Sequence, residues 1–119
     1  MPGWFKGSWG YHGDDGKFFI ESGTGATPSS DFGENGEFKS GDIVGACLNM
    51  DTGQAFCTCN GKKLNMGNAF EGHEESFKYG KMYPCIGFST AFDGMGLCVR
   101  VNFEGSGNHP FMYKGPFEF

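Results

Sequence analysis

The chain has 119 residues, which is enough for one small domain with a hydrophobic core. Its formal net charge is −5, and its nine basic residues are scattered and include a single arginine, so it lacks the clustered positive charge that attracts nucleic acids and anionic membranes. Glycine, with 22 copies, and phenylalanine, with 14, make turn formers and bulky sheet residues dominant, and this composition favours an all-β domain.

The N-terminal residues predict a loop and then a hairpin. Proline and glycine interrupt regular pairing over residues 1–7, so Trp4 and Phe5 are expected to be exposed. Residues 8–12 and 17–21 have the composition of two strands joined by a Gly-Asp-Asp-Gly turn. An irregular stretch rich in Gly, Ser, Thr and Pro follows over residues 22–40.

The centre of the chain predicts an antiparallel meander. Residues 43–50 and 54–59 are β-prone and are separated by Asp51-Thr52-Gly53. The pair Asn60-Gly61 supplies the two positive φ angles that a tight hairpin turn needs, and a third strand is expected to begin just after it.

The C-terminal half is expected to add further short strands. Residues 67–70 form a short strand or a bend, and residues 71–79 carry too many charges for a helix and predict an exposed excursion. Residues 81–89 and 97–103 predict strands, the second with clear alternation of apolar and polar side chains. Residues 109–113 predict a last strand or a docking segment. Six to eight short strands of this kind indicate one antiparallel sandwich or barrel over residues 1–119.

Five cysteines lie inside the predicted strands at positions 47, 57, 59, 85 and 98. An odd number without loop spacing favours reduced, buried thiols in a reducing, cytoplasmic compartment over a disulfide framework. No run has the length of a membrane span, and the N-terminus lacks a signal-peptide pattern.

The segment His12-Gly13-Asp14-Asp15 has residue types that bind metals, but a hairpin turn with solvated carboxylates explains it better. Neither a nucleophile elbow nor a phosphate loop is present in the sequence. We therefore expect no metal, no cofactor and no enzymatic activity. Arg100 is expected to form a surface salt bridge, although it offers an anchor for an acidic peptide group.

Six ordered segments give the chain a specific resemblance to the SPRY domain family, and within it to the Ran-binding protein M type. The segments are Ser8–Gly16 (SWGYHGDDG), Ser22–Gly25 (SGTG), Gly41–Gly45 (GDIVG), Asn60–Leu64 (NGKKL), Tyr83–Gly87 (YPCIG) and Val101–Phe103 (VNF). The resemblance implies a bent, antiparallel two-sheet β-sandwich that binds a short peptide segment of a partner protein through loops at one end. It also implies scaffold or substrate-recognition roles in ubiquitin ligase complexes.

The resemblance places the peptide groove in two loops, one before the Trp-Gly-Tyr strand and one after the Tyr-Pro-Cys-Ile-Gly strand. On this chain the implied partner-binding residues are Pro2, Gly3, Trp4, Phe5, Lys6, Tyr11, Ser89, Thr90, Phe92 and Asp93. The competing interpretation is that the aromatic side chains fold back and cap the sandwich.

The chain departs from the family pattern because members carry further strands before the Pro-Gly-Trp loop. We therefore expect an N-terminally truncated domain with an incompletely covered sheet, which favours a homodimer, a strand swap or aggregation through an exposed edge.

Two alternative functions fit the same sequence. Similar domains occur in secreted effectors of plant-parasitic nematodes, which act in the host cytoplasm on immune or ubiquitin machinery. A glycan-binding β-sandwich lectin would instead stack a sugar on Trp4 beside Asn35 or Asp93.

Overall fold

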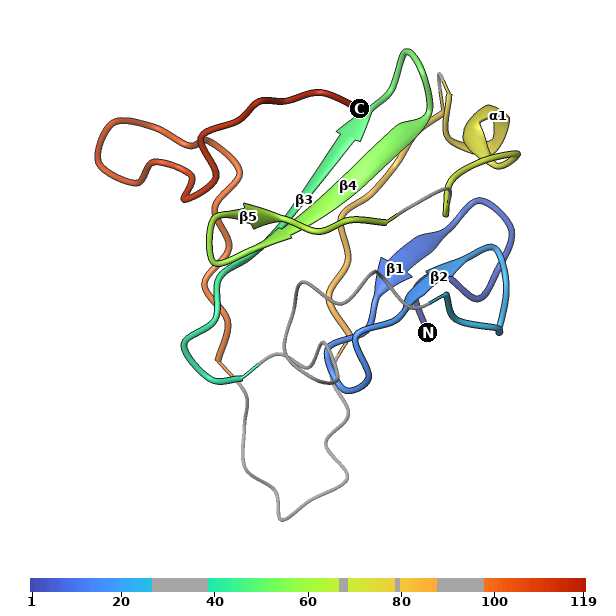
Figure 1. The fold of residues 1–119 in the computed structure, drawn as a ribbon, viewed down its shortest axis with the longest axis horizontal. Coiled ribbons are helices and arrows are strands. Elements are labelled where there is room, and N and C mark those ends of the chain that lie inside the picture. Colours follow the sequence, from blue (N-terminus) through green and yellow to red (C-terminus); the bar gives the residue numbers. More distant parts are fainter. Residues whose placement is uncertain (27–38, 67–68, 79, 88–97) are drawn as a thin grey trace.

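The computed structural model describes residues 1–26, 39–66, 69–78, 80–87 and 98–119 (Figure 1). Its first sheet is a hairpin of β1 (Trp9–Tyr11) and β2 (Phe18–Ile20), which are antiparallel with Trp9 opposite Ile20. The predicted first hairpin is therefore confirmed, with strands slightly shorter than expected.

The second sheet is the predicted meander. Strands β3 (Val44–Asn49), β4 (Gln54–Cys59) and β5 (Lys62–Lys63) are antiparallel and lie in the order β3-β4-β5. Asn60 and Gly61 both have positive φ, 49° and 80°, as the tight turn between β4 and β5 requires.

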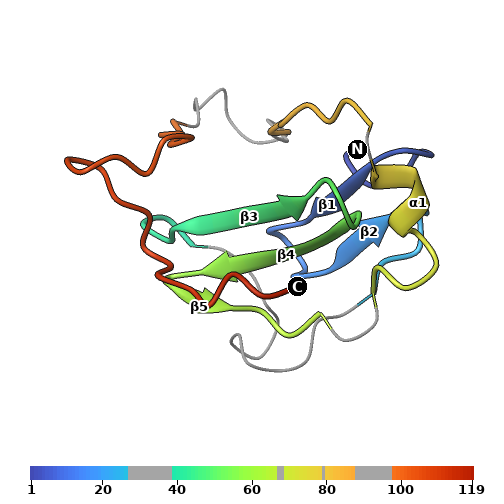
Figure 2. The same ribbon diagram turned by 90° about the horizontal axis from the view of Figure 1, so that it is seen from above.

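The two sheets share a hydrophobic core, and the views in Figures 1 and 2 show the hairpin beside the three-stranded sheet. Phe18 of β2 packs with Cys57 and Cys59 of β4 and with Leu64. Since both sheets are antiparallel and contribute to one core, the expected all-β, two-sheet sandwich is confirmed.

A second core cluster corrects the prediction for residues 71–79. This stretch contains a short helix, α1 (Glu74–Phe77), and the side chain of Phe77 is fully buried with Ile20 and Phe70. Glu71 and Glu75 are exposed, whereas Phe70 and Phe77 hold the segment in the core. Among the described residues, no helix has the length and apolar character needed to cross a bilayer.

Two predicted strands do not form within the residues that the structure describes. The described parts of the segments, residues 81–87 and 98–103, have irregular backbone, and Val99, Val101 and Phe103 are exposed. A strand needs a neighbour that pairs with its backbone, and alternation in the sequence does not supply one. Cys85 and Cys98 are exposed, which corrects the expectation that all five cysteines are buried. Cys57 and Cys59 are buried as expected.

Residues 109–113 form no strand either. The ring of Tyr113 instead contacts Phe56 of β4, with 5.6 Å between the ring centroids, and Phe119 contacts the same ring at 5.0 Å. Of the two expected alternatives, the tail is thus a docking segment.

Strand β3 lies at the edge of its sheet among the described strands. The amide of Asn60 donates to the carbonyl of Ile43 at 2.8 Å, so Ile43 is at a hydrogen-bonded position of the antiparallel ladder. Because such positions alternate, the backbone groups of Val44, Ala46 and Leu48 point away from β4 toward the free edge.

Candidate functional site

Six of the expected partner-binding residues lie within the described part of the chain. Pro2, Gly3, Trp4, Phe5 and Lys6 form the N-terminal loop, and Tyr11 ends β1. The remaining expected residues, Ser89, Thr90, Phe92 and Asp93, lie outside the described residues, as does Asn35 of the lectin alternative.

The hydroxyl of Ser8 organises the N-terminal loop. Its Oγ accepts hydrogen bonds from the amides of Gly3 at 3.1 Å and Phe5 at 3.3 Å, and donates to the carbonyl of Phe5 at 2.6 Å. The amide of Ser8 also donates to that carbonyl, at 3.0 Å. One short polar side chain therefore satisfies several backbone groups that would otherwise leave the loop free to change shape.

The start of the loop is tied to the β1–β2 hairpin. The amide of Ser22 donates to the carbonyl of Gly3 at 3.0 Å, and His12 Nε2 lies 3.1 Å from the carbonyl oxygen of Pro2. Gly3 has a φ of 91°, and a Cβ atom there would collide with the carbonyl oxygen of Phe19. Only glycine lets the loop approach the hairpin this closely.

The loop held in this way presents two aromatic side chains to water. Trp4 is 45% exposed and rests against His12 and Phe19, with ring centroids 6.2 Å away in each case. Phe5 is 70% exposed, which confirms the expected exposure of both residues. Lys6 is also exposed. We refer to the side chains of Trp4, Phe5 and Lys6 as the Trp4 surface.

Tyr11 is half-buried and packs against the core. Its ring stacks on Phe18 with 4.7 Å between centroids, and burial raises the pKa of its hydroxyl to about 12. In this structure Tyr11 packs with the core, apart from the Trp4 surface.

The segment that precedes Ser89 reaches the N-terminal loop. A Cβ atom added to Gly87 would lie 3.8 Å from Cδ of Pro2, an ordinary van der Waals contact. The described residues thus bring together the beginning of one expected loop and the residues that lead into the other.

The end of the loop is held by Glu21, a residue that sequence reasoning did not identify. Its Oε1 accepts a hydrogen bond from the amide of Gly7 at 2.6 Å, and its Oε2 lies 3.0 Å from Nδ1 of His73. The bond from His73, followed by that from Gly7, holds the pKa of the Glu21 carboxyl below its usual value. No local pattern reveals this contact, because His73 is 52 positions away in the sequence.

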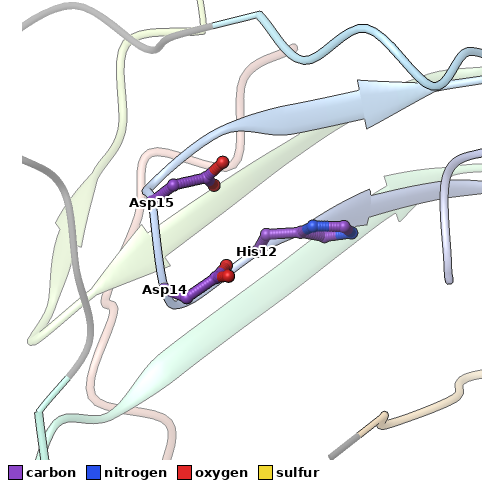
Figure 3. Close-up of side chains that lie close together, drawn as sticks. All are labelled: His12, Asp14 and Asp15. Carbon is purple, nitrogen blue, oxygen red and sulfur yellow. The ribbon is translucent and has the colours of Figure 1, made fainter. Parts of the chain in front are cut away.

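The side chains of His12, Asp14 and Asp15 come together at the hairpin turn, with potential ligand atoms within 4.8 Å of one another (Figure 3). Two of their polar atoms have partners: His12 Nε2 lies 3.1 Å from the carbonyl oxygen of Pro2, and Asp15 Oδ1 accepts the amide of Lys17 at 3.0 Å. Asp14 is exposed. These contacts are those of the hairpin turn that the sequence predicts.

The SPRY domain family model matches residues 1–106. The chain belongs to the SPRY family. This SPRY chain is 39% identical over 113 residues to Ran-binding protein 9 of Danio rerio and of Homo sapiens, and 38% identical over 113 residues to the Ran-binding proteins 9/10 homolog of Drosophila melanogaster. Each of these alignments covers 95% of this chain. The chain spans only 10 to 16% of the length of these relatives.

Proposed function

We propose that this SPRY chain is a protein-interaction module that binds a short extended segment of a partner protein through the Trp4 surface. The observation that supports the proposal is an aromatic loop whose backbone is fixed at both ends while its two largest side chains face water. A surface ordered before binding loses less conformational entropy when the partner arrives.

The side chains of the Trp4 surface suit a peptide ligand. Trp4 and Phe5 offer rigid apolar area, and large aromatic residues dominate the binding energy of protein interfaces. Lys6 adds a cation beside them. We propose that Ser89, Thr90, Phe92 and Asp93 line the other side of the site, because a Cβ atom added to Gly87 would lie within 3.8 Å of Pro2 in the N-terminal loop.

The test compares binding to an array of immobilised linear peptides with binding to a glycan array. We expect peptide capture, and replacing Phe5 by Ala should weaken it about tenfold or more, as expected for an interface hot spot. Phe103 is the matched control, because it is also 70% exposed but lies outside the loop. The Phe103→Ala variant should bind like the wild type.

Two results contradict this proposal. Capture of glycans without peptides would favour the lectin alternative. Equal peptide binding by the Phe5→Ala variant and the wild type would show that the N-terminal loop is not the site. Circular dichroism of each variant confirms that it is folded.

We further propose a role without catalysis, as a recruitment module of a ubiquitin ligase complex or, alternatively, as a secreted effector that engages such machinery in a host cytoplasm. The family membership supports a binding role, and five cysteines without a disulfide suit a reducing compartment. We also propose that two copies pair along the free edge of β3, where Val44, Ala46 and Leu48 present their backbone groups.

A further inference from the structure

We propose that Glu21 is the positioning residue of the N-terminal loop and that its contact with His73 anchors the partner-binding surface to the α1 segment. This inference rests on the proposed function only where it concerns binding, because the position of the loop can be measured without a partner.

Glu21 and its neighbour hold both ends of the loop. The amide of Ser22 binds the carbonyl of Gly3, where the loop begins, at 3.0 Å. At the other end, the amide of Glu21 donates to the carbonyl of Ser8 at 3.0 Å, and the Glu21 side chain accepts the amide of Gly7 at 2.6 Å. The residues that follow β2, Glu21 and Ser22, thus hold both ends of the N-terminal loop by hydrogen bonds.

The backbone of Glu21 is turned for this contact. Its φ is 51°, in the left-handed region that residues with a side chain rarely adopt. In that conformation the carboxylate reaches the loop and the segment before α1 at once. An unusual backbone angle that serves two side-chain contacts indicates a position set by the surrounding structure.

His73 connects Glu21 to the core. It lies directly before α1, its amide donates to the carbonyl of Phe70 at 3.0 Å, and its own carbonyl accepts the amide of Ser76 at 3.0 Å. Phe70 and Phe77 are buried together on either side of it. The Glu21 side chain is only 13% exposed, so water competes little for its hydrogen bonds. The loop is therefore connected through Glu21 and His73 to a segment that the buried side chains of Phe70 and Phe77 hold in the core.

The direct test is hydrogen exchange of the Gly7 amide, followed by NMR in the full chain. The Glu21→Ala variant removes both contacts and should accelerate this exchange about tenfold or more, because the Gly7 amide then loses its hydrogen-bond acceptor and opens to water. Glu21→Gln keeps an oxygen that can accept the Gly7 amide and should exchange much like the wild type. Glu75→Ala is the matched control, since it removes a glutamate side-chain contact elsewhere in the α1 segment, the 2.9 Å ion pair of Glu75 with Lys78.

Unchanged Gly7 exchange in Glu21→Ala overturns the inference. So does equal acceleration in Glu21→Gln, or a uniform acceleration of all slow amides, which would indicate general destabilisation. If Phe5→Ala binds peptide as well as the wild type, the proposed function fails. The Gly7 exchange rate still decides whether Glu21 positions the loop.

The peptide with the strongest signal on the array provides the binding readout. Glu21→Ala should weaken its capture, Glu21→Gln should restore it, and Glu21→Ala should add little to the loss caused by Phe5→Ala. Independent, additive losses would show that Glu21 does not act through the loop.

Discussion

Single polar side chains determine where the aromatic residues of this protein point. Ser8 closes the loop on itself, and Glu21 ties the end of that loop to His73. The backbone fixed by these bonds holds Trp4 and Phe5 at the surface. Tyr11, only a few positions later, instead stacks on the buried ring of Phe18. Aromatic residues thus serve both as exposed surface and as core packing, and the hydrogen bonds of the neighbouring backbone determine which.

The cysteines likewise divide into exposed and buried side chains. Cys85 and Cys98 are exposed, whereas Cys57 is buried and its burial raises the pKa of its thiol to about 12. Only the thiolate attacks a disulfide reagent, so the native protein should show two fast-reacting thiols and slow reaction of the buried ones. Titration with an aromatic disulfide reagent measures this, and replacing both exposed cysteines by Ser should abolish the fast phase. A fast reaction of Cys57 or Cys59 would contradict the placement of β4 in the core.

At the scale of elements, local sequence signals predicted the meander because each of its turns has its own chemistry. Asn60-Gly61 specifies a tight turn, and Gly53 ends the loop between β3 and β4 with a φ of 75°. Gly53 also faces α1, since a Cβ atom there would collide with the carbonyl group of Glu74. This turn is therefore also a contact surface for the helix.

The Gly53→Ala variant tests that contact. Gly72 is its matched control, because it has a similar φ of 83° but nothing within 4 Å of an added Cβ atom. Gly72→Ala should lower the free energy of unfolding by about 1 kcal/mol from backbone strain alone. Gly53→Ala should cost at least about 1 kcal/mol more, because the helix or the turn must also move. Urea unfolding curves measure both variants, and equal losses would show that the turn does not press on α1.

The elements that the sequence mispredicts depend on distant partners. Alternation over residues 97–103 describes a strand that has a sheet to pair with, yet in the structure Val99 and Val101 remain exposed and no pairing forms over residues 98–103. The many charges around α1 predicted an exposed segment. The burial of Phe77 was missed because it depends on packing with Phe70 and Ile20. The loop residues Trp4 and Phe5 were predictable from local composition, whereas the Glu21–His73 contact was not, since it joins separate parts of the fold.

Across the whole molecule, apolar surface lies next to an edge of β3 that no described strand pairs with. Val44 is 40% exposed, and the backbone groups of Val44, Ala46 and Leu48 face the free edge of β3. No charged residue or proline interrupts residues 43–50, although these are the features with which edge strands commonly prevent pairing. The formal net charge of −5 is the opposing force, because it repels a second copy.

The proposed pairing through β3 is tested by Ala46→Pro. The amide of Ala46 points to the free edge, so proline there removes a donor for the incoming strand without breaking a bond to β4. The wild type should associate as its concentration rises, and more strongly at about 1 M salt, where charges are screened beyond about 3 Å. Ala46→Pro should stay monomeric, whereas Ala46→Val, which keeps the amide, should associate like the wild type.

Multi-angle light scattering distinguishes these outcomes. A wild type that is monomeric at every concentration and salt level, or an Ala46→Pro variant that still associates, would exclude β3 as the contact edge.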